Sequence, residues 1–325
     1  MRTIPLVLLL LLSLPVVAQE RIRLVSYNVE NLFDCKDDSL TNDETFLPTS
    51  QRHWSEYRYW NKLHAISRAL TSIGGDRAPE LVALCEVEND SVLHDLTRRS
   101  SLRTIRYDYL VTSSTDPRGI DVALLYKPTT YRPFAHKVLR LPSDQIDEGG
   151  HVRDVLCVSG ELVTGDTLDV LVCHLPSRLN GRKSTRLRQR VVSLMCSAVD
   201  SISALRAVPH IVVMGDFNDT PDKLALRSLS DNGRMVCITG QLEGSYRYKG
   251  QWEQIDHVYL SPMLLDDTHR LHLSPRGAWV ASDDFLTEPE PLYGGRRPFR
   301  TYNGMRYMGG TSDHLPVCFD LLFSW

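Results

Sequence analysis

The stretch TSDHLPVCFD, residues 311–320, places an acid and a histidine, Asp313 and His314, just before an apolar run. Ser, Asp and His are common in turns, so a turn that precedes a buried strand is one explanation of this pattern. An acid beside an imidazole at a strand end can also bind a metal ion or transfer protons. The rest of the chain has to decide between these explanations.

Polar residues that could do chemistry also stand at the ends of five other apolar runs. They are Asn28 and Glu30 in SYNVEN, Glu86 in LCEVEN, His174 in LVCHLPSR, Asp216 and Asn218 in VVMGDFND, and Asp256 in QIDHVYLS. Each residue alone has a structural alternative, such as an amide that holds a turn or a core histidine with satisfied hydrogen bonds. Turn chemistry does not require the same placement at six strand ends. We therefore expect these side chains to meet in one cluster.

Such a cluster favours the chemistry of phosphate esters. Glu86 and Asp313 offer hard oxygen ligands, with Asn28 as a neutral donor, and this set suits Mg²⁺ or Ca²⁺ better than a soft metal. Mg²⁺ usually keeps water ligands and binds one or two carboxylates together with substrate phosphate. An imidazole such as His314 beside Asp256 would be oriented by the carboxylate and could carry a positive charge.

The elements that must position these residues are short apolar runs that alternate irregularly with helical patterns. The predicted strands are Ile22–Tyr27, Leu81–Cys85, Val122–Tyr126, Val152–Val158, Leu168–Cys173, His210–Met214, Ile255–Leu260 and Leu315–Phe323. The predicted helices are Tyr59–Ser72, Thr185–Ser203 and Pro221–Ser228, the last with Thr220 as cap and Pro221 in the first turn. This mixture predicts sheets covered by helices rather than a simple parallel sheet.

The net charge and the absence of internal boundaries limit the class of protein. The formal net charge is −3 and no linker, repeat or low-complexity tract interrupts the chain. Residues 19–325 are therefore interpreted as one large domain, without the global basic field of a nonspecific nucleic-acid binder. An anionic substrate would have to be bound by local charges.

The N-terminus, MRTIPLVLLLLLSLPVVA, has the features of a secretory signal. One Arg precedes a Leu/Val run, and Val16 and Ala18 are the small residues that a signal peptidase reads. We expect cleavage after residue 18 and a periplasmic or secreted protein without stable membrane insertion. The alternative, a retained anchor helix, is opposed by the shortness of the apolar run.

Cysteine contributes little to the predicted chemistry. Cys85, Cys157, Cys173 and Cys318 lie in apolar runs, so we expect buried thiols rather than a disulfide framework. No Cys/His spacing of a zinc site is present.

Taken in order, SYNVEN, LCEVEN, CHLPSR, GDFND, QIDHVYL and SDHLPV resemble the endonuclease/exonuclease/phosphatase superfamily, which includes deoxyribonuclease I, over nearly the whole mature chain. The resemblance implies a four-layer α/β sandwich of two packed mixed sheets flanked by helices. It also implies a phosphoesterase dependent on a divalent metal, with Mg²⁺ expected and Mn²⁺ or Ca²⁺ possible.

The resemblance also implies roles for individual residues at the metal site. Asn28 and Glu86 match metal-site positions of the family, and Glu30 matches an acidic residue found there in some branches. Asp313 matches the metal-linked aspartate near the C-terminus.

The remaining matches are catalytic. His174 matches the histidine that the nuclease and sphingomyelinase branches use at the scissile phosphate. Asp216 matches the aspartate that polarises the nucleophile, and Asn218 matches the asparagine that holds the nucleophile or the phosphate. Asp256 and His314 match the carboxylate–histidine pair.

Basic residues give weaker indications. Arg178, in the basic stretch 177–190, could contact a phosphate, although the pattern favours a basic solvated helix face. Arg118 precedes a strand and could face the cleft. Residues 296–307 interleave basic and aromatic side chains, as nucleic-acid or lipid headgroup contacts often do, with a packed surface loop as the alternative. Residues 34–57 and 278–310 depart from the better-known branches and look like those of exported bacterial members.

These observations predict an exported phosphodiesterase, most simply a nuclease acting on nucleic acid; no protein partner is implied. A phosphatase or sphingomyelinase-like enzyme acting on inositol or lipid phosphates is the alternative enzyme. Lipid attack would need an exposed apolar hairpin, for which residues 278–293, with Trp279, Phe285 and Leu292, are the candidate. A non-catalytic binding protein of the same fold is the third interpretation.

Overall fold

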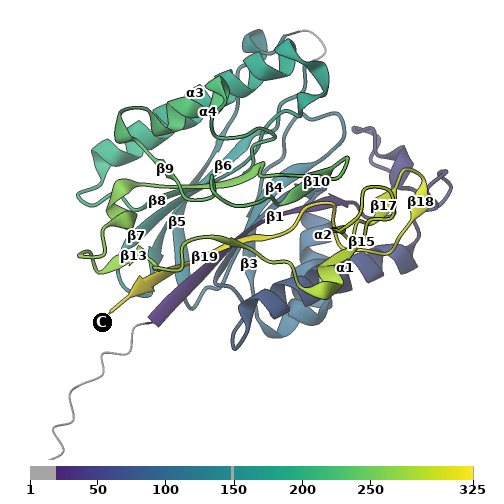
Figure 1. Ribbon diagram of the computed structural model, residues 1–325, viewed down its shortest axis with the longest axis horizontal. Helices are drawn as coiled ribbons and strands as arrows, with labels where there is room; N and C mark the ends of the chain where they lie inside the picture. The colour runs from purple at the N-terminus through teal and green to yellow at the C-terminus, as the bar shows by residue number, and fades with distance from the viewer. Residues whose placement is uncertain (1–19, 148–149, 325) are drawn as a thin grey trace, which may run out of the picture.

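The computed structural model describes residues 20–147 and 150–324. The predicted signal peptide, residues 1–18, lies outside them. Two large sheets pack face to face, and helices cover the outer face of each (Figure 1). This is the four-layer α/β sandwich that the resemblance implied.

The first sheet has the strand order β13–β19–β1–β2–β4–β3, and β14 also pairs with β19. Only β1 and β2 run parallel. The strands are β1 (Glu20–Leu32), β2 (Leu81–Val87), β3 (Asp108–Val111), β4 (Asp121–Tyr126), β13 (Leu271–Leu273), β14 (Trp279–Val280) and β19 (Val317–Phe323).

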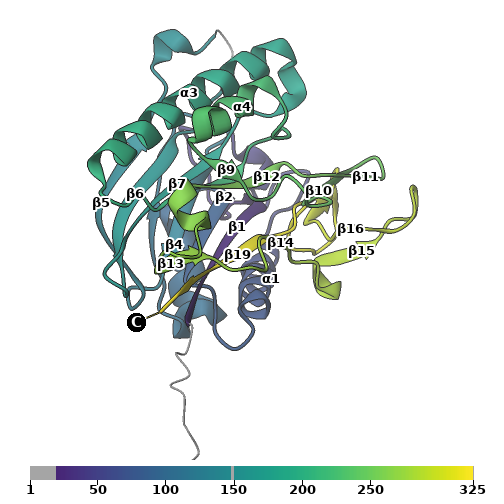
Figure 2. The same ribbon diagram turned by 60° about the vertical axis from the view of Figure 1, so that its left-hand side comes forward.

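The second sheet has the order β5–β6–β7–β8–β12–β9, in which only β7 and β8 are parallel. Its strands are β5 (Tyr131–Leu139), β6 (Val155–Leu162), β7 (Thr167–His174), β8 (Ile211–Asp216), β9 (Val236–Cys237) and β12 (Asp256–Leu260). Three small hairpins lie outside both sheets (Figure 2). They are β10 (Tyr246–Tyr248) with β11 (Gln251–Glu253), β15 (Thr287–Pro289) with β16 (Arg296–Pro298), and β17 (Tyr302–Asn303) with β18 (Arg306–Tyr307).

Alternation of side chains along the strands creates the layers. In β1, Ile22 and Leu24 enter the core between the sheets, whereas Val25 and Tyr27 face the helical layer on the other side. Because successive strand residues point to opposite faces, a strand that is apolar throughout must be covered on both. The helices α1 (Glu56–Gly74) and α2 (Asp90–His94) cover the first sheet, and α3 (Arg182–Leu205) and α4 (Leu224–Ser230) cover the second (Figure 1).

All eight predicted strands have counterparts, as do the two long helices. The third helix begins later than predicted, because Lys223 is extended at its N-cap (ψ 144°) and α4 starts at Leu224. Thr220 does not cap the helix, since its hydroxyl donates to the Asp222 carboxylate instead. Strand β5 was missed because its side chains are mostly exposed and form no apolar run.

All seven cysteines are free thiols, and the four predicted to be buried are buried. Within residues 20–147 and 150–324, no helix has the length and apolar character needed to cross a membrane.

Candidate active site

Strand register in the second sheet aligns three of the predicted residues. In the parallel pair β7–β8, His174 lies opposite Asp216, and in the antiparallel pair β8–β12, Asp216 lies opposite Asp256. Preceding residues of the same parity, such as Val172 and Met214, belong to the core between the sheets. The three polar side chains therefore continue an inward-facing row at the point where the apolar core ends.

Irregular backbone at the ends of β1 and β2 directs the residues of the first sheet. The β1–β2 register shifts after Asn28, and the β2–β4 register shifts around Glu86. Glu30, Asn31 and Glu86 have φ values of 51°, 51° and 64°, which are uncommon for residues other than glycine. Bulges of this kind re-aim side chains and are frequent beside active sites.

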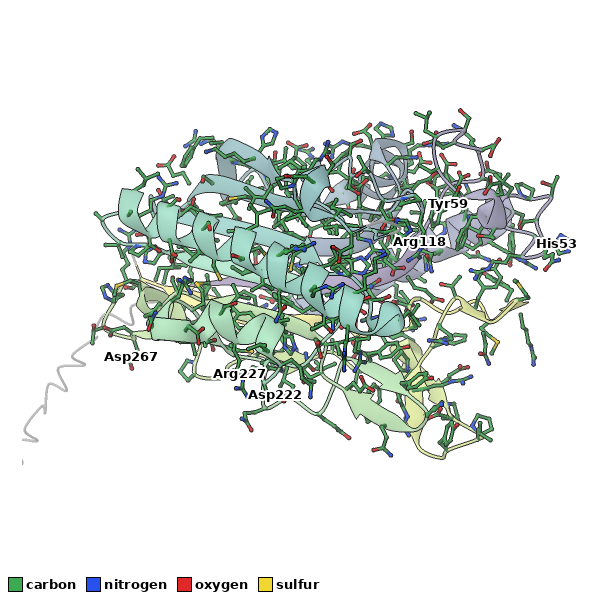
Figure 3. All side chains as sticks on the ribbon, turned by 90° about the horizontal axis from the view of Figure 1, so that it is seen from above. His53, Tyr59, Arg118, Asp222, Arg227 and Asp267 are labelled. Atoms are coloured by element: carbon green, nitrogen blue, oxygen red, sulfur yellow. The ribbon has the colours of Figure 1, made fainter. Side chains whose placement is uncertain are left out.

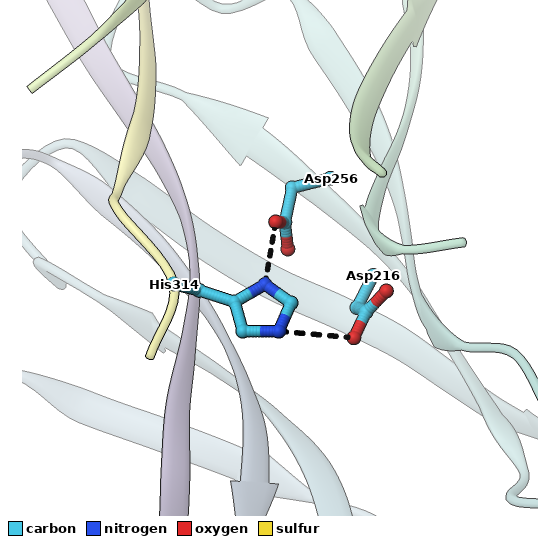
Figure 4. Close-up of side chains that lie close together, drawn as sticks. All are labelled: Asp216, Asp256 and His314. Atoms are coloured by element: carbon cyan, nitrogen blue, oxygen red, sulfur yellow. Dashed lines mark hydrogen bonds and ion pairs between the residues drawn. The ribbon is translucent and has the colours of Figure 1, made fainter. Parts of the chain in front are cut away.

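The imidazole of His314 lies between two carboxylates (Figure 4). Its Nδ1 is 2.7 Å from Asp256 Oδ2, and its Nε2 is 3.9 Å from Asp216 Oδ2. The Ser245 hydroxyl donates to the same Asp256 oxygen at 2.5 Å. Burial alone would lower the pKa of His314, but the charges of Asp256 and Asp216 hold it well above its ordinary value. The ring is therefore a buried imidazolium with a fixed orientation.

Asp216 is the centre of the cluster. Its Oδ2 accepts a hydrogen bond from Asn28 Nδ2 at 3.0 Å, across the space between the sheets, and its Oδ1 accepts one from the Asn218 backbone N–H at 2.8 Å. Burial, with the neighbouring Asp256 carboxylate, raises the pKa of Asp216 to about 7. A carboxylate with such a pKa can accept a proton near neutral pH.

His174 has the opposite electrostatic environment to His314. Its Nε2 lies 3.5 Å from Asp216 Oδ2 and 4.0 Å from Glu86 Oε1. Burial, together with the charges of Arg153 and Arg118, lowers the pKa of His174 well below its ordinary value. One neutral and one charged imidazole thus flank the same carboxylate, and such divergence often separates acid from base roles.

Glu86 and Asp313 supply carboxylates at the rim of the cavity. Glu86 Oε2 accepts the Asn31 N–H at 2.8 Å, whereas the only described neighbour of Oε1 within ion-pair distance is His174. Asp313 Oδ2 is bonded by Arg300 at 2.9 Å. Both carboxylates are of the ligand type that Mg²⁺ uses in proteins, where it commonly binds one or two carboxylates and takes its remaining ligands from water and phosphate.

Asp216, Asp256 and His314 also have ligand atoms within 4.8 Å of one another. We do not interpret this group as a closed metal site. The His314 Nδ1 already bonds Asp256, so the group is better described as a hydrogen-bonded carboxylate–imidazole pair facing a second carboxylate.

Two predicted site residues have other partners. Glu30 is not among the residues that line the cavity, and its carboxylate accepts the backbone N–H of Thr301 at 2.7 Å. Burial raises the pKa of Glu30 to about 7, and the buried Lys62 ammonium nearby bonds Thr301 Oγ1 at 2.5 Å. Glu30 therefore ties β1 to the C-terminal loops, and its role as a metal ligand stays a prediction. Arg178 lines the cavity but is paired with the Glu253 carboxylate.

Arg118 lines the cavity as predicted, with Nη2 4.0 Å from Glu86 Oε2. In Figure 3 it lies in the half of the molecule away from Asp267, near Tyr59. Sequence reasoning missed a second arginine, Arg153, which is 8% exposed and also lines the cavity. Asp116 connects the two, since it is 2.8 Å from Arg153 Nε and accepts the Arg118 backbone N–H at 2.8 Å. Arg153 lies within the predicted strand Val152–Val158, whereas β6 begins at Val155, so a basic residue at the start of a predicted apolar strand was the available signal.

The assembled site is a cavity of about 560 Å³, within the range of small-molecule and substrate sites. His174, Asp216, Asn218, Asp313 and His314 all line it. Asn28 and Asp256 lie behind this lining and bond Asp216 and His314, respectively.

Solved structures with the same fold cover nearly the whole chain. An endonuclease/exonuclease/phosphatase family protein from Bacteroides thetaiotaomicron is 16% identical, with a TM-score of 0.60 and coverage of 94% of this chain and 99% of that one. The human Nocturnin catalytic domain with bound sulfate is 17% identical, with a TM-score of 0.58 and coverages of 94% and 95%. D. rerio TDP2 complexed with a single-strand DNA product is 13% identical, with a TM-score of 0.57 and coverages of 93% and 98%. Identities this low show the shared fold alone.

No curated protein matches the chain. The model of the Endonuclease/Exonuclease/phosphatase family matches residues 23–322, from β1 to β19. This span contains every residue of the cavity described above. The chain therefore belongs to the endonuclease/exonuclease/phosphatase family.

Proposed function

We propose that this protein is a divalent-metal-dependent phosphodiesterase that cleaves nucleic acid. The observation that carries the proposal is the buried His314 imidazole between Asp256 and Asp216, in a cavity that Arg118 and Arg153 also line. A cavity with these charges accommodates a phosphate diester and supplies both a base and a cationic hydrogen-bond donor beside it.

In the proposed reaction, Asp216 accepts a proton from the water that attacks phosphorus. Asn28 and Asn218 hold the Asp216 carboxylate in place. The bond between the water oxygen and phosphorus forms and the ester bond breaks. The leaving oxygen takes up a proton from solvent, and Asp216 afterwards returns to solvent the proton that it accepted. The charged His314 ring stabilises negative charge on the phosphoryl oxygens, and Asp256 keeps its Nδ1 protonated.

The remaining lining residues position the phosphate. The neutral His174 ring lies beside Asp216 and donates a hydrogen bond to the phosphate. Arg118 and Arg153 offset the negative charge of the diester. Glu86 and Asp313 would hold a divalent cation, which would neutralise the phosphoryl oxygens.

The test is a substrate panel with the mature protein, with Mg²⁺, Mn²⁺, Ca²⁺ or EDTA. The panel contains single- and double-stranded DNA, RNA, inositol phosphates, sphingomyelin vesicles and bis(p-nitrophenyl) phosphate. We expect hydrolysis of DNA or RNA and of the chromogenic diester, and loss of both in EDTA. Turnover of none of these esters would favour the non-catalytic interpretation, and turnover unaffected by EDTA would refute metal dependence.

A lipid phosphodiester is the second candidate. Leu292 and Tyr293, between β15 and β16, are 79% and 50% exposed. Trp279 and Phe285 instead pack against the core beneath the first sheet, so the exposed apolar surface of this region is small. Sphingomyelin hydrolysis in excess of DNA and RNA hydrolysis would favour this candidate.

We also propose that the protein is exported and that residues 1–18 are removed. The support is the charged, apolar and small-residue pattern of this segment. Intact-mass measurement of the protein from its native envelope should show Gln19 as the first residue, and retention of Met1 would contradict export by this route.

A further inference from the structure

A second, smaller cavity of about 180 Å³ adjoins the catalytic cavity. The two share Tyr246, Tyr248 and Asp313 in their linings. The smaller cavity lies between the β10–β11 hairpin and strand β16, which both project from the sheets (Figure 2). A substrate longer than one phosphate group could extend from the first cavity into the second.

The second cavity is locally basic in a protein whose net charge is −3. Its basic lining residues are Arg247, Lys249, Arg297 and Arg300. Three carboxylates accompany them, because Glu290 and Asp313 line the cavity and Glu288 pairs with Arg297 at 2.8 Å. Within residues 20–147 and 150–324, Lys249 makes no ion pair. One cationic group therefore remains available for an anion.

Aromatic rings accompany the cations. Tyr246 lies against the His314 ring, with centroids 4.9 Å apart. Two residues further along β10, Tyr248 is 52% exposed, and Lys249 Nζ lies 5.2 Å from its ring centroid. An exposed ring beside a free ammonium group combines the two contacts that single-stranded nucleic acid makes, base stacking and phosphate pairing.

The hairpin that carries these groups is held in place. Lys249 and Gly250 form a two-residue turn with φ values of 47° and 79°, as in the tight turns that match the twist of a hairpin. A Cβ at Gly250 would come within 2.6 Å of Tyr293 Cβ, so the turn packs closely on the β15–β16 connection. Arg247 joins the same two segments by bonding Glu290 Oε2 at 2.6 Å and Gly294 O at 3.0 Å.

We infer that the second cavity binds the nucleotide next to the scissile phosphate of a single-stranded nucleic acid, with Tyr248 stacked on its base and Lys249 at its phosphate. The inference rests on the proposed phosphodiesterase function and narrows its substrate. A duplex hides the faces of its bases, and an inositol phosphate has no base to stack, so neither would use the Tyr248 ring.

The experiment compares kcat/KM for a short oligothymidylate with kcat/KM for bis(p-nitrophenyl) phosphate, which has no nucleobase. In Tyr248→Ala and in Lys249→Ala, we expect the ratio of the two values to fall by about tenfold, as for loss of one base stack or one phosphate contact. Tyr248→Phe should restore the ratio, because it keeps the ring. Phe134→Ala and Lys137→Ala are matched controls, since both side chains are exposed on β5, at the far edge of the second sheet. Thermal unfolding is measured for every variant.

An unchanged ratio in both variants would overturn the inference while leaving the phosphodiesterase intact. Loss of sphingomyelin hydrolysis but not of oligothymidylate hydrolysis in the same variants would assign the cavity to a lipid headgroup instead. If neither diester is hydrolysed, the proposed function fails separately. Fluorescence anisotropy of labelled oligothymidylate then decides the inference, because Tyr248→Ala should weaken binding about tenfold and equal binding would refute it.

Discussion

His314 and Asp256 should act as one unit in turnover. The pair is buried, and its 2.7 Å hydrogen bond is the shortest contact of the imidazole. Two unit charges about 4 Å apart attract by about 4 kcal/mol at an effective dielectric constant of about 20. This corresponds to a factor of about 10³ in rate, at about 1.4 kcal/mol per tenfold. Asp216 stays 3.9 Å from the other ring nitrogen and retains part of this stabilisation, so we expect Asp256→Asn to lower kcat by about 10²- to 10³-fold.

The assay is hydrolysis of bis(p-nitrophenyl) phosphate at saturating Mg²⁺ by Asp256→Asn, His314→Ala and the double variant. His314→Ala should lose at least as much kcat as Asp256→Asn. The double variant should be little worse than the more damaged single variant, because groups that act as a unit are strongly non-additive.

The control separates catalysis from stability. Asp169, at the other end of β7, is also fully buried and bonds Arg206 at 2.9 Å. Asp169→Asn removes a buried carboxylate from the same sheet and should lower the melting temperature without a comparable loss of kcat. Near-normal turnover by His314→Ala, or losses that multiply in a folded double variant, would refute the coupled pair.

Three further predictions follow from individual contacts. Glu86→Gln should shift the Mg²⁺ activation curve to higher concentration by about tenfold with little change in melting temperature, and an unchanged curve would show that Glu86 is not a ligand. Arg153→Lys should lower kcat/KM by about tenfold or more, since a single ammonium cannot bond Asp116 and face the diester together; equal activity would remove Arg153 from the site. Burial lowers the pKa of His257 to about 4, although the ring also bonds the Asp219 carbonyl, so this residue should destabilise the fold in acid. The unfolded imidazole binds a proton below about pH 6.5, so the free energy of unfolding should fall between pH 6.5 and 4 by up to about 3 kcal/mol, and chemical denaturation of His257→Gln should show a shallower fall; identical pH profiles would contradict this.

Much of the fold could be predicted because its signals are local. Runs such as Leu168–Cys173 are apolar at every position, and only a strand covered on both faces accounts for them. Elements without such a run were missed, including the exposed edge strand β5 and the β10–β11 hairpin, whose Lys-Gly turn is a weak signal. The start of α4 was also wrong, because Pro and Thr suit a preceding turn as well as a first helical turn.

The sequence by itself determined which chemistry was available. Six strand ends carry carboxylates, amides or imidazoles. Successive side chains of a strand point to opposite faces, which is a property of the local backbone. The inward-facing row of His174, Asp216 and Asp256 therefore follows from the strands that these residues end or begin.

Only the tertiary structure decided which of these groups work together. Asn28 meets Asp216 across 188 positions of sequence, and Glu30, two residues later, bonds Thr301 across 271 positions instead. Glu30 has a left-handed backbone conformation and does not line the cavity, while Asp116 pairs with Arg153 at the cavity wall. Which side chains meet depends on strand register, bulges and packing between distant segments. A short stretch of sequence does not determine these long-range contacts.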